Sequence, residues 1–190
     1  MLGLAGGVGS GKSLVARLLK ERGADVVDAD ALGHRALERP EIKRRLVRAW
    51  VPGILRGAGI DRGALARAAF GSRASALRLN RIVHPFILRE MRRRLAGRRG
   101  WTVLDAALLF EASADRLCDR VIFVDAPLRL RVRRTKGRGW PPGELERREQ
   151  FQWSVAYKKK KADYVINNTG STSRTNRQIG KILDDLRRTF

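Results

Sequence analysis

Short apolar runs alternate with amphipathic stretches along this chain. The runs are Leu2–Ala5, Ala24–Asp30, Trp101–Asp105, Arg120–Asp125 and Tyr164–Asn167. Apolar runs of this length are typical of parallel strands that are buried on both faces. The stretches around them have helical spacing and predict helices over residues 14–20, 128–135, 144–160 and, last, up to Leu186. Strands that alternate with helices predict an α/β fold, a doubly wound parallel sheet of five strands with helices on both faces.

A longer and mostly helical stretch covers residues 31–100, between the second and third predicted strands. It is rich in Leu, Ala and Arg, and positions such as Ile82, Val83 and Phe86 suit helices that bury one face. Breaks are expected around residues 51–53 and 57–59 and at His84–Pro85, because proline restricts the residue before it. A second special segment, Lys136–Gly143, is basic and rich in Gly and Pro, and it predicts a mobile loop.

These patterns fit a single domain over residues 1–190, with a helical subdomain at about 31–100 and a lid at about 136–160. No apolar stretch approaches the roughly 20 residues that span a bilayer, and no secretory signal is visible. The sequence has one cysteine and two histidines, so neither an intrachain disulfide nor a zinc-like cluster is expected. We expect a cytoplasmic protein without a membrane partner.

The charge of the chain is unusual. It carries 41 Lys and Arg against 19 Asp and Glu, a formal net charge of +22. Runs such as Arg92–Arg94, Arg98–Arg99 and Lys158–Lys161 suit a nucleic-acid backbone, but they also suit solvated helix faces in an arginine-rich protein. Because no aromatic-interleaved RNA-binding pattern accompanies the charge, nucleic acid is a possible partner that the sequence does not favour.

The segment GGVGSGKS, Gly6 to Ser13, carries the clearest chemistry. Its spacing matches G-x-x-x-x-G-K-[ST], the phosphate-binding P-loop. Backbone N–H groups of its glycines form an anion nest, and a following helix N-terminus adds partial positive charge. The predicted ATP-binding residues are Gly7, Val8, Gly9, Ser10, Gly11, Lys12, Ser13 and Leu14. Lys12 reaches the β- and γ-phosphates in this interpretation, and the Ser13 hydroxyl helps to hold Mg²⁺, so ATP and Mg²⁺ are the expected cofactors.

P-loops occur in GTPases, motors and kinases. Asp30–Gly33 matches the D-x-x-G motif of GTPases, but the sequence contains no N-K-x-D guanine motif. A large ATPase does not suit 190 residues. A small-molecule kinase fits best, since it needs an acceptor pocket, an orienting carboxylate and a basic lid.

Several further segments resemble the dephospho-CoA kinase family in order and spacing. They are Ala5–Ser13, Val27–Asp30, Asn80–Pro85, Asp105–Glu111, and Arg148, Gln152 and Lys158 followed by Ala162–Asn168. The resemblance runs from residue 3 to about residue 171. The sequence departs from the family pattern at Leu14, where Thr is usual, and at Ala107, where Pro is usual.

The resemblance implies transfer of the γ-phosphoryl group of ATP to the ribose 3′-hydroxyl of dephospho-CoA. It favours Asp30 as the catalytic carboxylate and Lys12 as a second catalytic residue. The alternative role for Asp30 is that of a helix N-cap. Arg138, and less strongly Arg134, are expected to approach the phosphates when the loop closes; a solvated basic loop is the alternative. Acceptor contacts are expected from Asp30, His84, Leu108 and Glu111, although His84 before a proline also suits a structural role. A nucleoside or nucleotide kinase and a nucleic-acid-binding P-loop protein are the alternative functions.

Overall fold

The computed structural model describes residues 1–50, 53–95, 100–137, 143–150 and 152–189. The chain divides into two compact units. The first consists of Met1–Val27, Arg99–Phe110 and Ala114–Phe190, and the second of Asp28–Arg98 with Glu111–Ser113.

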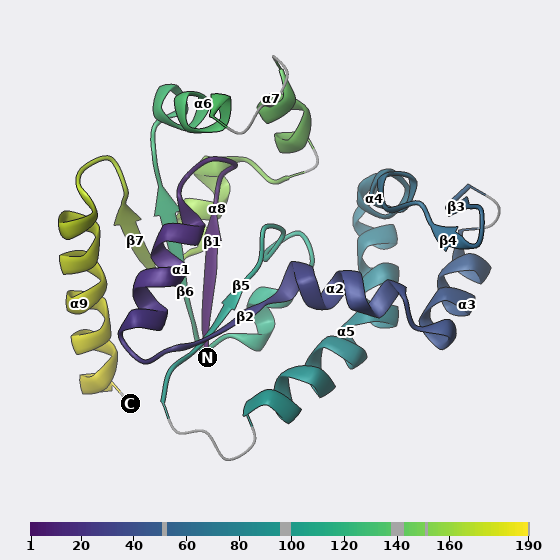
Figure 1. Cartoon of the computed structure of the whole chain (residues 1–190), viewed down its shortest axis with the longest axis horizontal. Coiled ribbons are helices and arrows are strands. Elements are labelled where there is room, and N and C mark those ends of the chain that lie inside the picture. Colours follow the sequence, from purple (N-terminus) through teal and green to yellow (C-terminus); the bar gives the residue numbers. More distant parts are fainter. Residues whose placement is uncertain (51–52, 96–99, 138–142, 151, 190) are drawn as a thin grey trace. The chain divides into compact units, whose positions relative to one another are not determined.

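The first unit is built on a five-stranded parallel sheet with the strand order β2-β5-β1-β6-β7 (Figure 1). The strands are β1 (Leu2–Gly6), β2 (Asp25–Asp28), β5 (Thr102–Asp105), β6 (Arg120–Asp125) and β7 (Tyr164–Asn167). Around them lie α1 (Lys12–Glu21), the 3-10 helix η1 (Ala114–Leu117), α6 (Leu128–Lys136), α7 (Glu144–Glu149), α8 (Val155–Lys161) and α9 (Thr172–Thr189). All five apolar runs are strands, so the fold predicted from the sequence is confirmed.

Strand β1 lies at the centre of the sheet. It pairs in parallel with β5, where Leu4 faces Asp105, and with β6, where Gly6 faces Val124. The carboxyl ends of these strands therefore meet at one edge of the sheet. In open α/β sheets this is the edge at which ligands bind.

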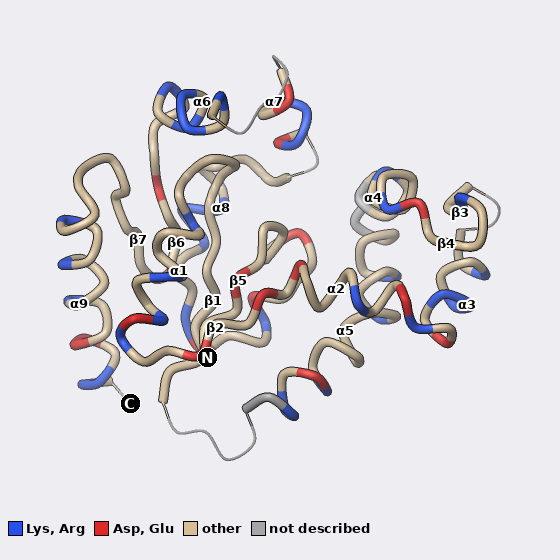
Figure 2. Tube along the Cα trace, in the orientation of Figure 1, with Lys and Arg blue, Asp and Glu red and all other residues tan. Residues whose placement is uncertain are grey.

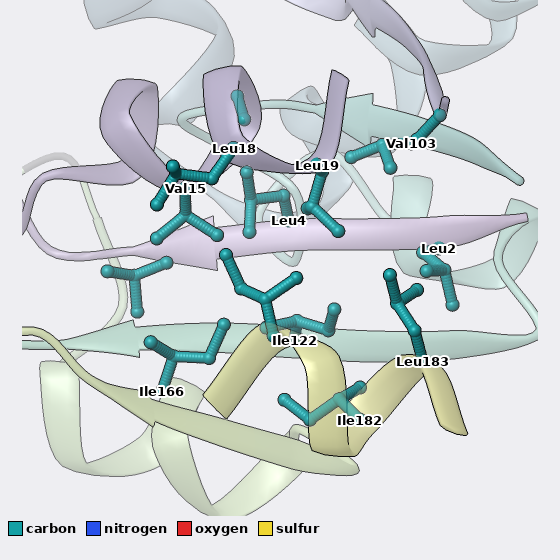
Figure 3. Close-up of a cluster of buried hydrophobic side chains, with 14 of the residues drawn as sticks. Leu2, Leu4, Val15, Leu18, Leu19, Val103, Ile122, Ile166, Ile182 and Leu183 are labelled. Carbon is teal, nitrogen blue, oxygen red and sulfur yellow. The ribbon is translucent and has the colours of Figure 1, made fainter. Parts of the chain in front are cut away.

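The side chains of β1 alternate between the two faces of the sheet, as the strand pleat requires. Leu2 and Leu4 belong to the cluster that α1 and α9 bury against one face, together with Ile122 and Leu183 (Figure 3). On the other face a side chain at Gly3 would meet Leu109 and Cys118. The apolar runs read as doubly buried strands because both faces are covered in this way.

The second unit is helical apart from one short hairpin. Its elements are α2 (Ala29–Leu37), α3 (Pro40–Ala49), β3 (Leu55–Arg56), β4 (Gly59–Ile60), α4 (Arg62–Phe70) and α5 (Arg73–Leu95) (Figure 1). Its core gathers Leu46, Ile54, Leu65 and Phe86. The break at residues 57–59 is the turn of the hairpin, which the sequence pattern did not predict. The predicted break at Val51–Pro52 lies outside the described residues.

The predicted helix break at His84–Pro85 is wrong, because α5 runs through both residues. Pro85 removes one helical hydrogen bond and crowds the carbonyl four residues earlier, which destabilises a helix by about 3 kcal/mol. Burial of Ile82, Val83 and Phe86 on the same helix works against that loss. Tertiary packing therefore overrides the local signal.

The single helix predicted over residues 144–160 is also wrong, since α7 ends at Glu149 and α8 begins at Val155. Ser154 caps α8: its side chain accepts a hydrogen bond from the Tyr157 N–H at 3.2 Å. A serine at this position favours a new helix start over continuation of the preceding helix.

Candidate active site

The P-loop follows β1 directly and leads into α1, which is the strand–loop–helix context that the motif requires. Gly9 has φ of 75° and Gly11 has φ of 91°, in the left-handed region that favours glycine. Gly11 is also the N-cap of α1, and its carbonyl accepts a hydrogen bond from Leu14 N at 3.0 Å. The backbone of the loop therefore lies at the N-terminus of α1, the positive end of the helix dipole. Helix N-termini of this kind bind phosphate groups.

The side chain of Ser10 packs against Gly6, the first residue of the P-loop. Ser10 is 1% exposed, and a Cβ at Gly6 would lie 2.5 Å from Ser10 Oγ. Among the residues that the structure describes, this buried hydroxyl finds no hydrogen-bond partner. A buried hydroxyl without a partner is costly, and such groups are common where a ligand later supplies the bond.

Lys12 and Asp105 form an ion pair at the carboxyl edge of the sheet. Lys12 opens α1, and Asp105 ends β5, the strand beside β1. Their side chains are 18% and 17% exposed, so the pair is partly shielded from water. Ser13, the next residue of α1, is exposed. A cation, a carboxylate and a hydroxyl therefore belong to neighbouring segments at this edge.

Two residues that sequence reasoning missed hold the start of the P-loop. The Arg131 side chain of α6 is buried, and its Nη1 donates to Val8 O at 3.1 Å and to Glu149 Oε1 of α7. The same Glu149 oxygen accepts a hydrogen bond from Val8 N at 3.1 Å. Arg131 shares its face of α6 with buried Thr135, but nothing in the arginine-rich sequence of that helix sets it apart.

Arg134 is expected to approach the phosphates. In the structure it donates a hydrogen bond to a backbone carbonyl of the P-loop. Its Nη1 donates to Ser10 O at 3.0 Å and its Nη2 to Asn168 O at 2.8 Å. Burial lowers the pKa of Arg134, but a guanidinium still keeps its charge at neutral pH. Arg138 lies outside the described residues.

The second unit contains the predicted catalytic carboxylate, Asp30. The Asp28 carboxylate caps α2, where its Oδ1 accepts a hydrogen bond from Ala31 N at 2.8 Å. Asp30 follows in the first turn of α2 and is exposed. The alternative role of Asp30 as the helix N-cap is therefore wrong, because Asp28 performs it.

The predicted acceptor residues are divided between the two units. His84 lies on α5, where burial lowers its pKa, so its imidazole is neutral at pH 7. Glu111 belongs to the second unit and is 7% exposed. Leu108 is half-buried in the first unit, three residues after β5.

Lys158 differs from the rest of its basic run. It is 1% exposed, and its Nζ donates to Gln152 Oε1 at 2.7 Å. Lys159, Lys160 and Lys161 are exposed, and Lys159 pairs with Asp125. The run is expected to be mostly a solvated face, with Lys158 set apart by the family spacing, and Lys158 is the lysine that is buried. Figure 2 shows other basic positions on α6, α7 and α9.

The described ranges contain no cluster of three or more His, Cys, Asp or Glu side chains that suits a metal ion. No helix within these ranges is long and apolar enough to cross a membrane.

Comparison with known proteins gives a consistent result. A sequence model of the dephospho-CoA kinase family matches residues 1–174. The chain is 40% identical to the dephospho-CoA kinase of Deinococcus radiodurans, over 97% of this chain and 91% of that protein. It is 39% identical to the dephospho-CoA kinase of Geobacillus kaustophilus, over 96% and 94%.

Two solved structures share the fold of this chain. The crystal structure of TT1252 from Thermus thermophilus matches with a TM-score of 0.80 and 35% identity, covering 97% of this chain and 96% of that one. A dephospho-CoA kinase from Campylobacter jejuni, 20% identical with a TM-score of 0.50 over 97% and 95% of the two chains, shares the fold.

Proposed function

The chain belongs to the dephospho-CoA kinase family, and from this membership we propose that it transfers the γ-phosphoryl group of ATP to the ribose 3′-hydroxyl of dephospho-CoA. The products are coenzyme A and ADP. The observation that carries the proposal is the P-loop at the carboxyl edge of the sheet, with the Lys12–Asp105 pair beside it. Phosphoryl transfer needs positioned positive charge more than covalent chemistry, and this edge supplies it.

ATP is the proposed donor, held by residues Gly7 to Leu14. The N–H groups of the loop face the phosphates, and the α1 dipole favours their negative charge. When ATP binds, the Lys12 ammonium leaves its ion pair with Asp105 and binds the β- and γ-phosphates. Its charge there stabilises the transition state. The unpartnered hydroxyl of Ser10 supports a loop that is completed by a ligand.

Mg²⁺ is the proposed metal ion, and the residues present fit it. Mg²⁺ prefers oxygen ligands, usually one or two from the protein with the rest from phosphates and water. The exposed Ser13 hydroxyl lies next to Lys12, whose ammonium the Asp105 carboxylate reaches. Ser13 would hold the ion, with Asp105 as the neighbouring carboxylate. When bound, Mg²⁺ neutralises charge on the transferred group.

Asp30 is the proposed catalytic carboxylate. It follows the carboxyl end of β2 by two residues, and the N-cap of α2 is Asp28. It orients the 3′-hydroxyl and accepts its proton as the oxygen bonds to the γ-phosphorus and ADP leaves. Arg138 approaches the phosphates from the lid, at about residues 136–160. Asp30, His84, Leu108 and Glu111 contact the acceptor, with His84 as a neutral imidazole.

The test is an assay of ATP consumption with dephospho-CoA, nucleosides and nucleoside monophosphates as acceptors. We expect turnover with dephospho-CoA and a product with the mass of coenzyme A. Faster turnover of a nucleoside or nucleotide would replace the proposal with another P-loop kinase function. Binding to arbitrary duplex DNA, titrated with salt, checks the basic surface, because binding driven by phosphate contacts falls steeply with salt. We expect dephospho-CoA kinetics that are unaffected by added duplex.

A further inference from the structure

The carbonyl groups on the outer side of the P-loop are bound by residues from distant parts of the chain. In a trans peptide the C=O of one residue and the N–H of the next point in opposite directions. A contact that fixes the Ser10 carbonyl therefore also fixes the direction of the Gly11 N–H, which is part of the phosphate nest. The outer contacts of the loop thus control its inner surface.

Two side chains donate to the Ser10 carbonyl. Asn168 Nδ2 lies 2.8 Å from Ser10 O, and Arg134 Nη1 lies 3.0 Å from the same atom. Asn168 is 1% exposed, so water competes little for its bond. A side chain at Gly11 would collide with Asn168 Nδ2, which shows how closely the amide lies against the loop.

Asn168 is itself fixed on three sides. Its backbone N–H donates to Asp125 O at 2.8 Å, at the end of β6, and its carbonyl accepts from Arg134 Nη2. Its side-chain Oδ1 accepts from Thr175 Oγ1 of α9 at 3.0 Å, and Thr175 is fully buried. The Thr175 bond sets the orientation of the amide, so that the NH₂ group faces Ser10.

We propose that Asn168 is a positioning residue of the ATP site: by holding the Ser10 carbonyl outward, it directs the Gly11 N–H toward the phosphates. The proposal rests on the proposed function, in which the P-loop binds ATP. Its contribution is to nucleotide binding, because the nest contacts the phosphates both before and during transfer. Loss of this contact raises the KM for ATP and leaves kcat little changed.

The first test compares the same substitution at two adjacent asparagines. Asn168→Asp keeps an acceptor for Thr175 but replaces the NH₂ donor with an oxygen that faces Ser10 O. Asn167→Asp adds the same charge one residue earlier, on an exposed side chain whose Oδ1 accepts hydrogen bonds from Thr169 N and Thr169 Oγ1. ATP affinity is measured calorimetrically, without acceptor. We expect the affinity of Asn168→Asp to be about ten- to hundredfold lower than that of Asn167→Asp. This is the range for loss of a hydrogen bond to a charged group, here the bond from the Gly11 N–H to a phosphate. Affinities within about twofold would overturn the proposal.

A second pair of variants introduces no charge and serves if Asn168→Asp does not fold. Thr175→Val removes the hydroxyl that orients the Asn168 amide, whereas Thr175→Ser keeps it. We expect weaker ATP binding in Thr175→Val than in Thr175→Ser, with the KM for dephospho-CoA equal in both. Lower melting temperature with equal ATP affinity would show a structural role alone and would overturn the proposal.

These measurements separate the proposal from the proposed function. A wild-type chain that binds ATP but does not phosphorylate dephospho-CoA would contradict the function, and the binding comparison would still decide the role of Asn168. A wild-type chain that binds no ATP would contradict both.

Discussion

Substitution of Asp30 by Asn tests the catalytic carboxylate most directly. The change keeps the size of the side chain and one acceptor oxygen, but it removes the charge and the basicity. General acid–base groups typically contribute about 10²- to 10⁴-fold to the rate. We therefore expect kcat to fall by about that factor, or about 3 to 5 kcal/mol of activation free energy.

The position of Asp30 in α2 indicates what the substitution does to the helix start. Asp28, not Asp30, caps α2, with Oδ1 at 2.8 Å from Ala31 N. Asp30 is exposed in the first turn, where a negative charge near the helix N-terminus contributes about 0.3 to 1 kcal/mol. Loss of this charge in Asp30→Asn should therefore remove about 0.3 to 1 kcal/mol of helix-dipole stabilisation from the free energy of unfolding.

Asp28 provides the matched control, because it is a carboxylate two residues away with a structural role. Asn caps helices about as well as Asp, so Asp28→Asn should change neither kcat nor stability appreciably. Asp28→Ala removes the cap and should lower the free energy of unfolding by about 1 kcal/mol while kcat stays near the wild-type value. Substitution at position 30 is thus expected to lower mainly kcat, and loss of the cap at position 28 to lower mainly the free energy of unfolding.

The measurements are kcat, the KM of each substrate, and urea unfolding, on one preparation of each variant. A group that acts mainly in the transition state lowers kcat and kcat/KM together, and the affinity for ATP should stay near wild type. A kcat for Asp30→Asn within about threefold of wild type, well below the general acid–base range, would refute the assignment of Asp30 as the catalytic carboxylate.

Three further predictions concern the P-loop lysine Lys12, the half-buried histidine His84 and the cysteine Cys118. Lys12→Ala should reduce kcat by at least about 10²-fold, since preorganised charges contribute at this level, whereas Lys20→Ala on the exposed side of α1 should not; circular dichroism checks that both variants fold. Burial lowers the folded-state pKa of His84, so the unfolded chain binds more protons below the ordinary value of about 6.5. Stability should therefore decrease as pH falls from 7 to 5, as measured by urea unfolding, and this slope should be smaller in His84→Gln; an equal slope would contradict the assignment. Burial raises the pKa of the Cys118 thiol to about 12, so alkylation at pH 8 should be about a thousandfold slower than in urea, and comparable rates would refute the burial of that thiol.

The sheet of this protein could be predicted from the sequence because its strands are short and the three central ones, β5, β1 and β6, are apolar runs with buried interiors. The P-loop could be predicted for a similar reason, since its function requires glycine where the backbone turns and approaches phosphate. Both signals are local in the sequence. Each of the five predicted strands is present, and the loop joins β1 to α1 as expected.

The errors occurred where distant contacts decide the local structure. Pro85 indicates a helix end, but buried neighbours on α5 keep the helix intact. Lys158 stands in a run of four lysines, which by composition suits a solvated face; the family resemblance sets it apart from the other three, and it is buried against Gln152. In both cases the residue type has one ordinary preference, and packing against residues far away or on a neighbouring turn changes it.

The hydrogen bonds that hold the P-loop from outside could not be predicted either, because they too join residues that are distant in the sequence. Arg131 and Glu149 hold Val8, while Arg134 and Asn168 hold Ser10, and these four residues come from α6, α7 and the segment after β7. Their motif partners lie more than 120 residues earlier in the chain. Four arginines lie within six residues of α6, at 129, 131, 133 and 134, and composition does not distinguish the two that bind the loop.

The energetics of glycine explain why this support is needed. Glycine loses more conformational freedom on folding than any other residue, and four of the eight P-loop residues are glycine. A loop of this composition does not hold its N–H groups in one direction by its own preferences. The hydrogen bonds from Arg131, Arg134 and Asn168 restrict the loop by binding its carbonyl groups, Val8 O and Ser10 O. The conformation of the P-loop therefore depends on the whole first unit, and we expect substitutions at its outer contacts to weaken ATP binding.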